Sequence, residues 1–196
     1  MIGDRIGQRC RHGVSKVACC VLIGALAMLL ETLPGCSSLQ QPDYPDLPTV
    51  DYVDLDRYLG RWYEIARYPN DFEQGCVGVT ADYSLRDDGQ IGVVNTCRNS
   101  DGGAKERIQG VARVDDRTTN AKLKVSFFWP FSGPYWIIDL DPDYRYAVVG
   151  EPSRRFFWIL SRTPTMEDET LKDILQKMPG WSYDQDRLYF VPQFGE

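Results

Sequence analysis

The sequence predicts an all-β protein, an eight-stranded up-and-down antiparallel barrel with one C-terminal α-helix packed outside. Three observations predict this fold. Segments of about 7 to 11 residues with alternating apolar and polar side chains follow one another from residue 61 onward. The connections after the first are short, so strands that are neighbours in sequence pair in space. One later segment repeats its apolar residues at helical spacing. Eight strands close into a barrel that can hold one small ligand.

The strands are placed by their alternation and by the turns between them. In residues 77–85 (VGVTADYSL), apolar side chains alternate with small or polar ones, as on a strand with one buried face. The segment Arg86-Asp87-Asp88-Gly89 then forms a tight turn, with glycine where φ must be positive. We expect strands at residues 61–68, 77–85, 91–98, 106–114, 121–128, 134–140, 144–150 and 155–162.

A single helix follows the last barrel strand. Thr165 is the expected N-cap, and acidic residues at 167–169 complement the dipole of the first turn. The apolar residues at helical spacing are Leu171, Ile174, Leu175 and Met178. We expect this stripe to pack on the outer wall of the barrel, against Phe157 and Ile159, and a short final strand to form at residues 188–191.

Residues 1–35 resemble an export signal. A basic start precedes a 14-residue apolar run (VACCVLIGALAMLL), which is shorter than the roughly 20 residues that span a bilayer. The following Leu33-Pro34-Gly35-Cys36 resembles the lipobox of bacterial lipoproteins, which implies that Cys36 becomes the lipid-bearing N-terminus. Ser37 after it resembles the class sorted to the outer membrane. The alternative is a plain secretory signal with Cys36 as an ordinary thiol.

The chain therefore divides into a signal peptide at residues 1–35, a lipidated tether at 36–51 and a barrel domain at 52–196. The tether is polar, and its three prolines exclude a helix interior or a central strand. After the signal is removed, 18 basic and 26 acidic residues remain, a net charge of −8. This acidic balance argues against nucleic-acid binding.

The one histidine, His12, leaves with the signal. Its loss excludes a Ser-His-Asp or Cys-His dyad, a His-ligated haem and the usual His-rich zinc site. No metal and no cofactor is expected.

Three motifs at barrel spacing carry a family resemblance. Gly60-Arg61-Trp62 resembles the G-x-W motif of lipocalins, Asp141-Pro142-Asp143-Tyr144 their second region, and residues 157–164 (FWILSRTP) their third. The segments YLGRWYEIARYPN and LKVSFFWPF are most similar to the bacterial outer-membrane lipocalins. The resemblance implies a ligand cavity and a place at the periplasmic face of the outer membrane.

Three motif residues are structural in this interpretation. Trp62 and Arg162 come from the first and last barrel strands at the closed end. There the guanidinium covers the indole, a cation-π contact of roughly 1 to 2 kcal/mol when desolvated. Gly60 permits the close turn into the first strand.

The ligand site is expected on the side chains that face the lumen. Most are apolar, with Tyr135 or the turn residue Arg86 available to a lipid head group. The predicted ligand-binding residues are Tyr83, Val93, Asn95, Val125, Phe127, Tyr135, Ile137, Val149 and Trp158. The alternative is a filled barrel without a cavity, which would make the protein a structural envelope lipoprotein.

Cys76 begins the second strand and Cys97 ends the third, so folding the hairpin brings them opposite each other. In an exported protein such a pair favours a disulfide. The competing hypothesis is an enzyme that uses a free Cys76, as one branch of lipocalins uses a cysteine near this strand. No histidine or adjacent lysine is available in the sequence to lower the pKa of that thiol.

The apolar run Phe127-Phe128-Trp129-Pro130-Phe131 is unusual for a solvated turn. Such a surface marks a membrane or partner contact, including pairing of two copies as a homodimer, unless these residues only continue a strand.

Taken together, the anchor motif, the barrel and the missing histidine predict a lipid-anchored, non-enzymatic binding protein. It would store or transport an amphipathic lipid, such as a fatty acid or a lysophospholipid.

Overall fold

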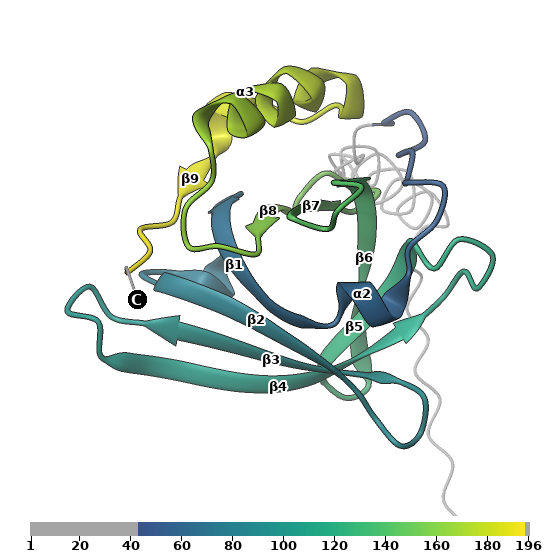
Figure 1. Ribbon diagram of the computed structural model, residues 1–196, viewed down its shortest axis with the longest axis horizontal. Coiled ribbons are helices and arrows are strands. Elements are labelled where there is room, and N and C mark those ends of the chain that lie inside the picture. The colour runs from purple at the N-terminus through teal and green to yellow at the C-terminus, as the bar shows by residue number, and fades with distance from the viewer. Residues whose placement is uncertain (1–42, 195–196) are drawn as a thin grey trace, which may run out of the picture. The chain divides into compact units, whose positions relative to one another are not determined.

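The computed structural model describes residues 43–194, and their strands form one antiparallel sheet that closes into a barrel (Figure 1). The strand order is β2-β3-β4-β5-β6-β7-β8-β1-β9, and an additional pairing of β1 with β2 closes the sheet. The predicted signal peptide and Cys36 lie outside the described residues. The strands are β1 (Gly60–Arg67), β2 (Val77–Leu85), β3 (Ile91–Arg98), β4 (Ala104–Val114), β5 (Lys122–Phe128), β6 (Phe131–Leu140), β7 (Tyr146–Gly150), β8 (Phe157–Ser161) and β9 (Tyr189–Phe190).

The eight-stranded barrel confirms the predicted fold, with differences at strand ends. β7 begins two residues later than expected because Tyr144 has a φ of 61°, a left-handed conformation that interrupts a strand. β8 begins at Phe157 because the carboxylate of Glu151 accepts hydrogen bonds from the amides of Ser153, Arg155 and Phe156 and folds these residues into a loop. We call the end of the barrel where β1 begins the closed end, and the end where β1 finishes the open end.

A short helix, α2 (Leu55–Tyr58), precedes β1 and was not predicted. The side chain of Asp54 caps it by accepting hydrogen bonds from the amides of Asp56 and Arg57. A four-residue helix is too short to show an apolar period, so the sequence pattern gives no signal for it. Its last residue, Tyr58, is buried in the core.

The predicted C-terminal helix is α3 (Asp168–Lys177), and it lies outside the barrel (Figure 1). Its N-cap is Glu167, not the expected Thr165, and no side chain caps it. Ile174 is fully buried in one cluster with Phe157 and Ile159, which confirms the predicted contact with the outer wall. Single turns of 3-10 helix form η1 (Asp71–Glu73), η2 (Met178–Trp181) and η3 (Gln185–Arg187).

The last residues of the described chain complete the pairing of β1. β1 pairs with β2 at Gly60–Tyr63 and with β9 at Ala66 and Arg67. Between these two places, the side-chain amide of Gln193 donates hydrogen bonds to the carbonyls of Glu64 and Val79. The C-terminal segment thus fills the space where β1 and β2 separate.

The segment before α2 lies along the outside of the barrel. The Pro45 carbonyl accepts a hydrogen bond from Arg154, in the open-end loop after β7. The Val53 amide donates to Thr119, in the closed-end loop after β4. Leu47, between them, is buried. Residues 43–51 of the predicted tether therefore pack against the domain and do not act as a free spacer. Among residues 43–194, no helix is long and apolar enough to cross a membrane.

Candidate ligand-binding cavity

The closed end of the barrel is sealed around Trp62, which is fully buried. The Arg162 guanidinium carbon lies 3.8 Å from the centroid of the indole ring. Its terminal nitrogens donate hydrogen bonds to the carbonyls of Arg61 (2.9 Å) and Arg57 (2.6 Å), and the Trp62 indole donates to the Tyr58 carbonyl (2.8 Å). Gly60 has a φ of 92° at the turn into β1, a conformation that favours glycine. Arg162 therefore joins α2, β1 and β8 and covers the indole.

Above this end the barrel encloses a cavity of about 970 Å³ that opens at the other end. Its volume is within the range of ligand pockets, and a filled barrel is therefore the wrong interpretation for the described residues. Seven of the nine predicted ligand-binding residues line the cavity: Tyr83, Val93, Asn95, Val125, Phe127, Tyr135 and Trp158.

The other two, Ile137 and Val149, lie outside the lining. They are cross-strand partners on β6 and β7, and both are fully buried in the barrel core with Leu160 and Ala147. Ile137 is two residues nearer the closed end than Tyr135, so it packs in the solid lower part of the barrel. The alternation of apolar and polar residues correctly identifies which side chains face inward. It does not show which of them line the cavity and which pack in the solid core below it.

Three tyrosines separate the cavity from the solid core. The hydroxyl of Tyr135 lies 2.8 Å from that of Tyr58 and accepts a hydrogen bond from that of Tyr83 at 2.9 Å. Burial raises the pKa of Tyr83 to about 12, so its hydroxyl stays protonated at ordinary pH. Tyr135 is therefore bonded within the protein, and the expected alternative, Arg86, lies at the closed end beside Asp88. Neither is placed to receive a head group near the mouth.

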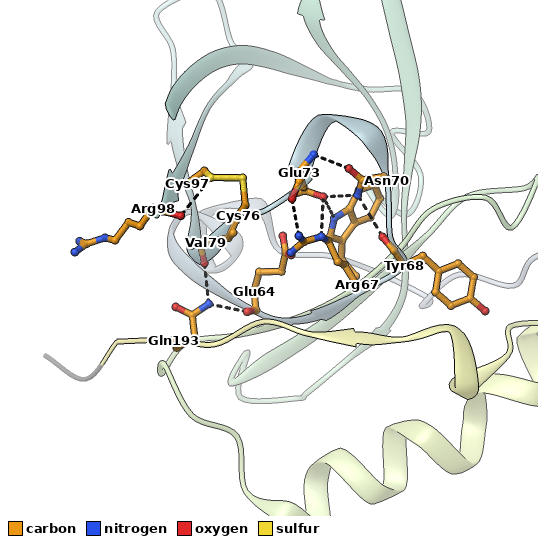
Figure 2. A network of polar contacts seen from close by, with 11 residues as sticks. Glu64, Arg67, Tyr68, Asn70, Glu73, Cys76, Val79, Cys97, Arg98 and Gln193 are labelled. Atoms are coloured by element: carbon orange, nitrogen blue, oxygen red, sulfur yellow. Dashed lines mark hydrogen bonds and ion pairs between the residues drawn. A yellow bond between two sulfur atoms is a disulfide. The ribbon is translucent and has the colours of Figure 1, made fainter. Parts of the chain in front are cut away.

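The polar wall of the cavity instead comes from two carboxylates that the sequence pattern did not predict, Glu64 on β1 and Glu73 in η1 (Figure 2). Arg67 lies between them: one terminal nitrogen donates to Glu64 at 2.7 Å, and its Nε is 3.7 Å from the Glu73 carboxylate. The Trp158 indole donates to the same Glu73 carboxylate at 3.2 Å. All three charged residues are buried.

One guanidinium thus faces two carboxylates in a wall shielded from water. Burial raises the pKa of Glu64 well above its usual value, the Glu73 charge raises it further, and Arg67 only partly opposes this. The sequence held a signal for Glu64, because it shares the inward face of β1 with Trp62. It held none for Glu73, which a loop brings to the wall.

Cys76 and Cys97 form the predicted disulfide, which joins the start of β2 to the end of β3 at the open end (Figure 2). Both residues line the cavity. Because the sulfur of Cys76 is bonded to that of Cys97, Cys76 has no free thiol to act as a nucleophile. Among residues 43–194, no group of three or more His, Cys, Asp or Glu side chains is arranged to hold a metal ion.

Aromatic side chains surround the mouth. Phe72, on η1, is 60% exposed and its ring centroid is 5.6 Å from that of Phe156. The ring of Phe156 in turn stacks on Trp158 at 5.8 Å. These contacts continue the apolar lining from the cavity to the surface of the open end.

Comparison with known proteins gives consistent findings. A family model described as a lipocalin-like domain matches residues 53–193. The outer membrane lipoprotein Blc of Escherichia coli (strain K12) is 45% identical over 161 residues, covering 82% of this chain and 90% of that protein. Temperature-induced lipocalin-1 of Arabidopsis thaliana is 40% identical over 157 residues, covering 76% and 83%. The structure of insecticyanin from the tobacco hornworm Manduca sexta superposes with a TM-score of 0.63 at 24% identity, covering 79% and 88%.

Proposed function

The chain belongs to the lipocalin family, a family of binding proteins for small hydrophobic molecules, and on this premise we propose that it binds and carries an amphipathic lipid in its barrel cavity. The observation that carries the proposal is the cavity of about 970 Å³, whose lining is mainly apolar and aromatic. An acyl chain buried there gains about 0.8 kcal/mol per methylene. Binding therefore needs no special chemistry at the site.

The charges on the wall favour one class of lipid. Five carboxylate residues line the cavity, against Arg155 in the lining and Arg67 between Glu64 and Glu73. The Glu151 carboxylate is engaged by its own loop, and the balance of the wall is still negative. A cavity lined by one sign of charge attracts the opposite sign. A zwitterionic lysophospholipid, whose head group carries a cationic nitrogen, therefore suits this wall better than the anionic carboxylate of a fatty acid. The charged lining residues are Glu64, Asp71, Glu73, Glu106, Glu151 and Arg155.

A lipid anchor at Cys36 is part of the same proposal. Relatives 45% and 44% identical to this chain are named outer membrane lipoproteins. In this chain Cys36 follows Leu33-Pro34-Gly35. We place the protein at the periplasmic face of the outer membrane, with residues 1–35 removed. Radiolabelled palmitate should enter the wild-type protein and not the Cys36→Ser variant; continued labelling of the variant would contradict the assignment.

Native mass spectrometry of protein extracted from its own membrane tests the cavity. We expect co-purified lipid in the wild type and its loss in Ala81→Trp, because Ala81 lines the cavity and an indole there would occupy the acyl-chain space. Ser84→Trp is the matched control, since Ser84 is exposed on the same strand. A folded Ala81→Trp protein that retains as much lipid as Ser84→Trp would refute the proposal.

Competition between lysophosphatidylcholine and palmitate tests the head-group preference. We expect the wild type to prefer lysophosphatidylcholine at neutral pH, and Glu73→Gln to reduce that preference. An unchanged ratio of affinities in Glu73→Gln would show that the wall charge does not select the lipid.

A further inference from the structure

The turn between β5 and β6 carries large aromatic side chains that nothing in the described residues covers. Phe128 is 69% exposed, Trp129 92% and Phe131 76%. We call these three residues the aromatic tip. Phe128 and Phe131 are cross-strand partners that end β5 and begin β6, so the structure places the turn itself at Trp129 and Pro130. No charged residue occurs from Val125 to Ile138.

The aromatic tip is part of the rim of the cavity. Phe128 and Phe131 line the mouth, as does the exposed Phe72 from η1. The apolar lining therefore extends from Phe127 on β5 to Phe128 and Phe131 of the aromatic tip. Contiguous exposed apolar surface of this kind marks a contact site.

The path of the N-terminal segment indicates what lies at this end. The Pro45 carbonyl is hydrogen-bonded to Arg154 at 2.6 Å, and the Arg154 guanidinium carbon is 5.2 Å from the Tyr44 ring centroid. Arg154 belongs to an open-end loop, so the chain leaves the domain at the open end. Cys36 precedes Asp43 by seven residues, which span at most about 25 Å when fully extended. An acyl anchor on Cys36 therefore keeps the open end nearer the bilayer than the closed end.

We propose that the open end of the barrel faces the bilayer that holds the anchor, with the aromatic tip inserted at the interface between lipid head groups and acyl chains. Tryptophan and other aromatic side chains favour that interface. The mouth of the cavity then opens onto the membrane surface, and a lipid passes between bilayer and cavity with little exposure to water. The orientation rests on the proposed anchor but not on which ligand the cavity takes.

The charge of the domain separates this contact from electrostatic adsorption. The chain is acidic, and the exposed residues Asp71 and Glu106 also line the mouth. A contact carried by the uncharged aromatic tip should persist in high salt, whereas a contact made by basic residues would weaken as salt screens it.

The experiment uses the lipidated protein reconstituted in phosphatidylcholine vesicles, with or without brominated acyl chains. Trp129 emission is obtained as the difference between wild type and Trp129→Gln. The orientation control is Trp129→Gln/Leu85→Trp, because Leu85 is 63% exposed at the opposite, closed end. We expect brominated lipid to quench most of the Trp129 emission and little of the emission from the indole introduced at position 85, equally in low salt and in about 1 M salt.

Three outcomes would overturn the proposal. Trp129 could remain unquenched by brominated lipid, or the indole at position 85 could be quenched as strongly. Trp129 could also be shielded from both brominated lipid and aqueous acrylamide, which would place a second copy of the chain over the aromatic tip. Trp158 lines the cavity, so brominated lipid that enters the cavity quenches it in every variant. Quenching of Trp158 in the Trp129→Gln variant therefore measures ligand uptake separately from membrane insertion. If the lipid anchor fails, the protein is absent from the membrane fraction.

Discussion

Glu64 is a carboxylate in an apolar wall, held by a guanidinium that also faces Glu73. Its pKa is raised in the folded protein, mainly by burial, so the folded state holds the Glu64 proton more tightly than the unfolded state does. Wherever the folded state binds more protons, stability falls as pH rises. The contribution of Glu64 is therefore most favourable in acid and is lost as pH rises above the ordinary pKa of a glutamate.

The Glu64→Gln variant tests this at residue scale. The amide oxygen can still accept from Arg67, but the negative charge next to Glu73 is gone. As pH rises above the ordinary glutamate pKa of about 4.3, we expect the wild type to lose stability relative to Glu64→Gln, by roughly 1 to 3 kcal/mol at neutral pH, the order of one buried charged hydrogen-bonding group. Denaturant unfolding across this range measures it. A constant difference between the two proteins would contradict the raised pKa.

The roles of residues in a short sequence motif were predicted correctly. The roles of residues whose position depends on their height in the barrel, or on the path of a loop, were not. Trp62 and Arg162 meet as their motifs implied. Ile137 was assigned to the cavity because alternation reports the face of a strand and not the height along it. Glu73 was missed because η1, and not a strand, brings it to the cavity wall.

The hairpin of β2 and β3 is held at the open end by the disulfide, across a sequence separation of 21 residues. Closing a loop of this size contributes roughly 3 kcal/mol, mainly by restricting the unfolded chain. We expect Cys76→Ala/Cys97→Ala to lose about that much free energy of unfolding while keeping lipid in the cavity. Denaturant unfolding and native mass spectrometry measure the two effects. Loss of lipid from a folded double variant would show that the disulfide itself shapes the site.

Elements with a long regular pattern were predicted from the sequence, and short or capped ones were not. The barrel strands and α3 have enough residues to show their periods. The first residues of α3 differed because Thr165 lies in a turn, where its carbonyl accepts from the Thr163 hydroxyl. The loop before β8 is held by the Glu151 carboxylate, which accepts hydrogen bonds from the amides of Arg155 and Phe156. Hydrogen bonds of this kind produce no repeating pattern of apolar residues in the sequence.

At the scale of the whole molecule, a bound lipid should stabilise the fold. A ligand that binds only the folded state at about 100 times its Kd adds about 2.7 kcal/mol. We expect lysophosphatidylcholine to raise the unfolding midpoint of the wild type and of Ser84→Trp in proportion to the logarithm of its concentration, and not that of Ala81→Trp. Thermal or denaturant unfolding below the micelle concentration measures the effect. Equal shifts in all three proteins would indicate binding outside the cavity.

The closed barrel was predictable because eight alternating segments with short connections leave few other arrangements. The existence and size of the cavity were not, because they depend on how aromatic side chains share the lumen. Tyr58, from the unpredicted α2, helps to fill the lower half and so sets where the empty volume begins.

The pairing of β1 with both β2 and β8 also limits when the barrel can close as the chain is synthesised. β1 is the first strand of the barrel to leave the ribosome, yet its partner Phe157–Ser161 is nearly the last. Until that segment arrives, the β1 edge is open and the barrel cannot close, because pairings this far apart in sequence form late. A chain of this design therefore cannot complete its barrel until the segment of β8 is present to pair with β1.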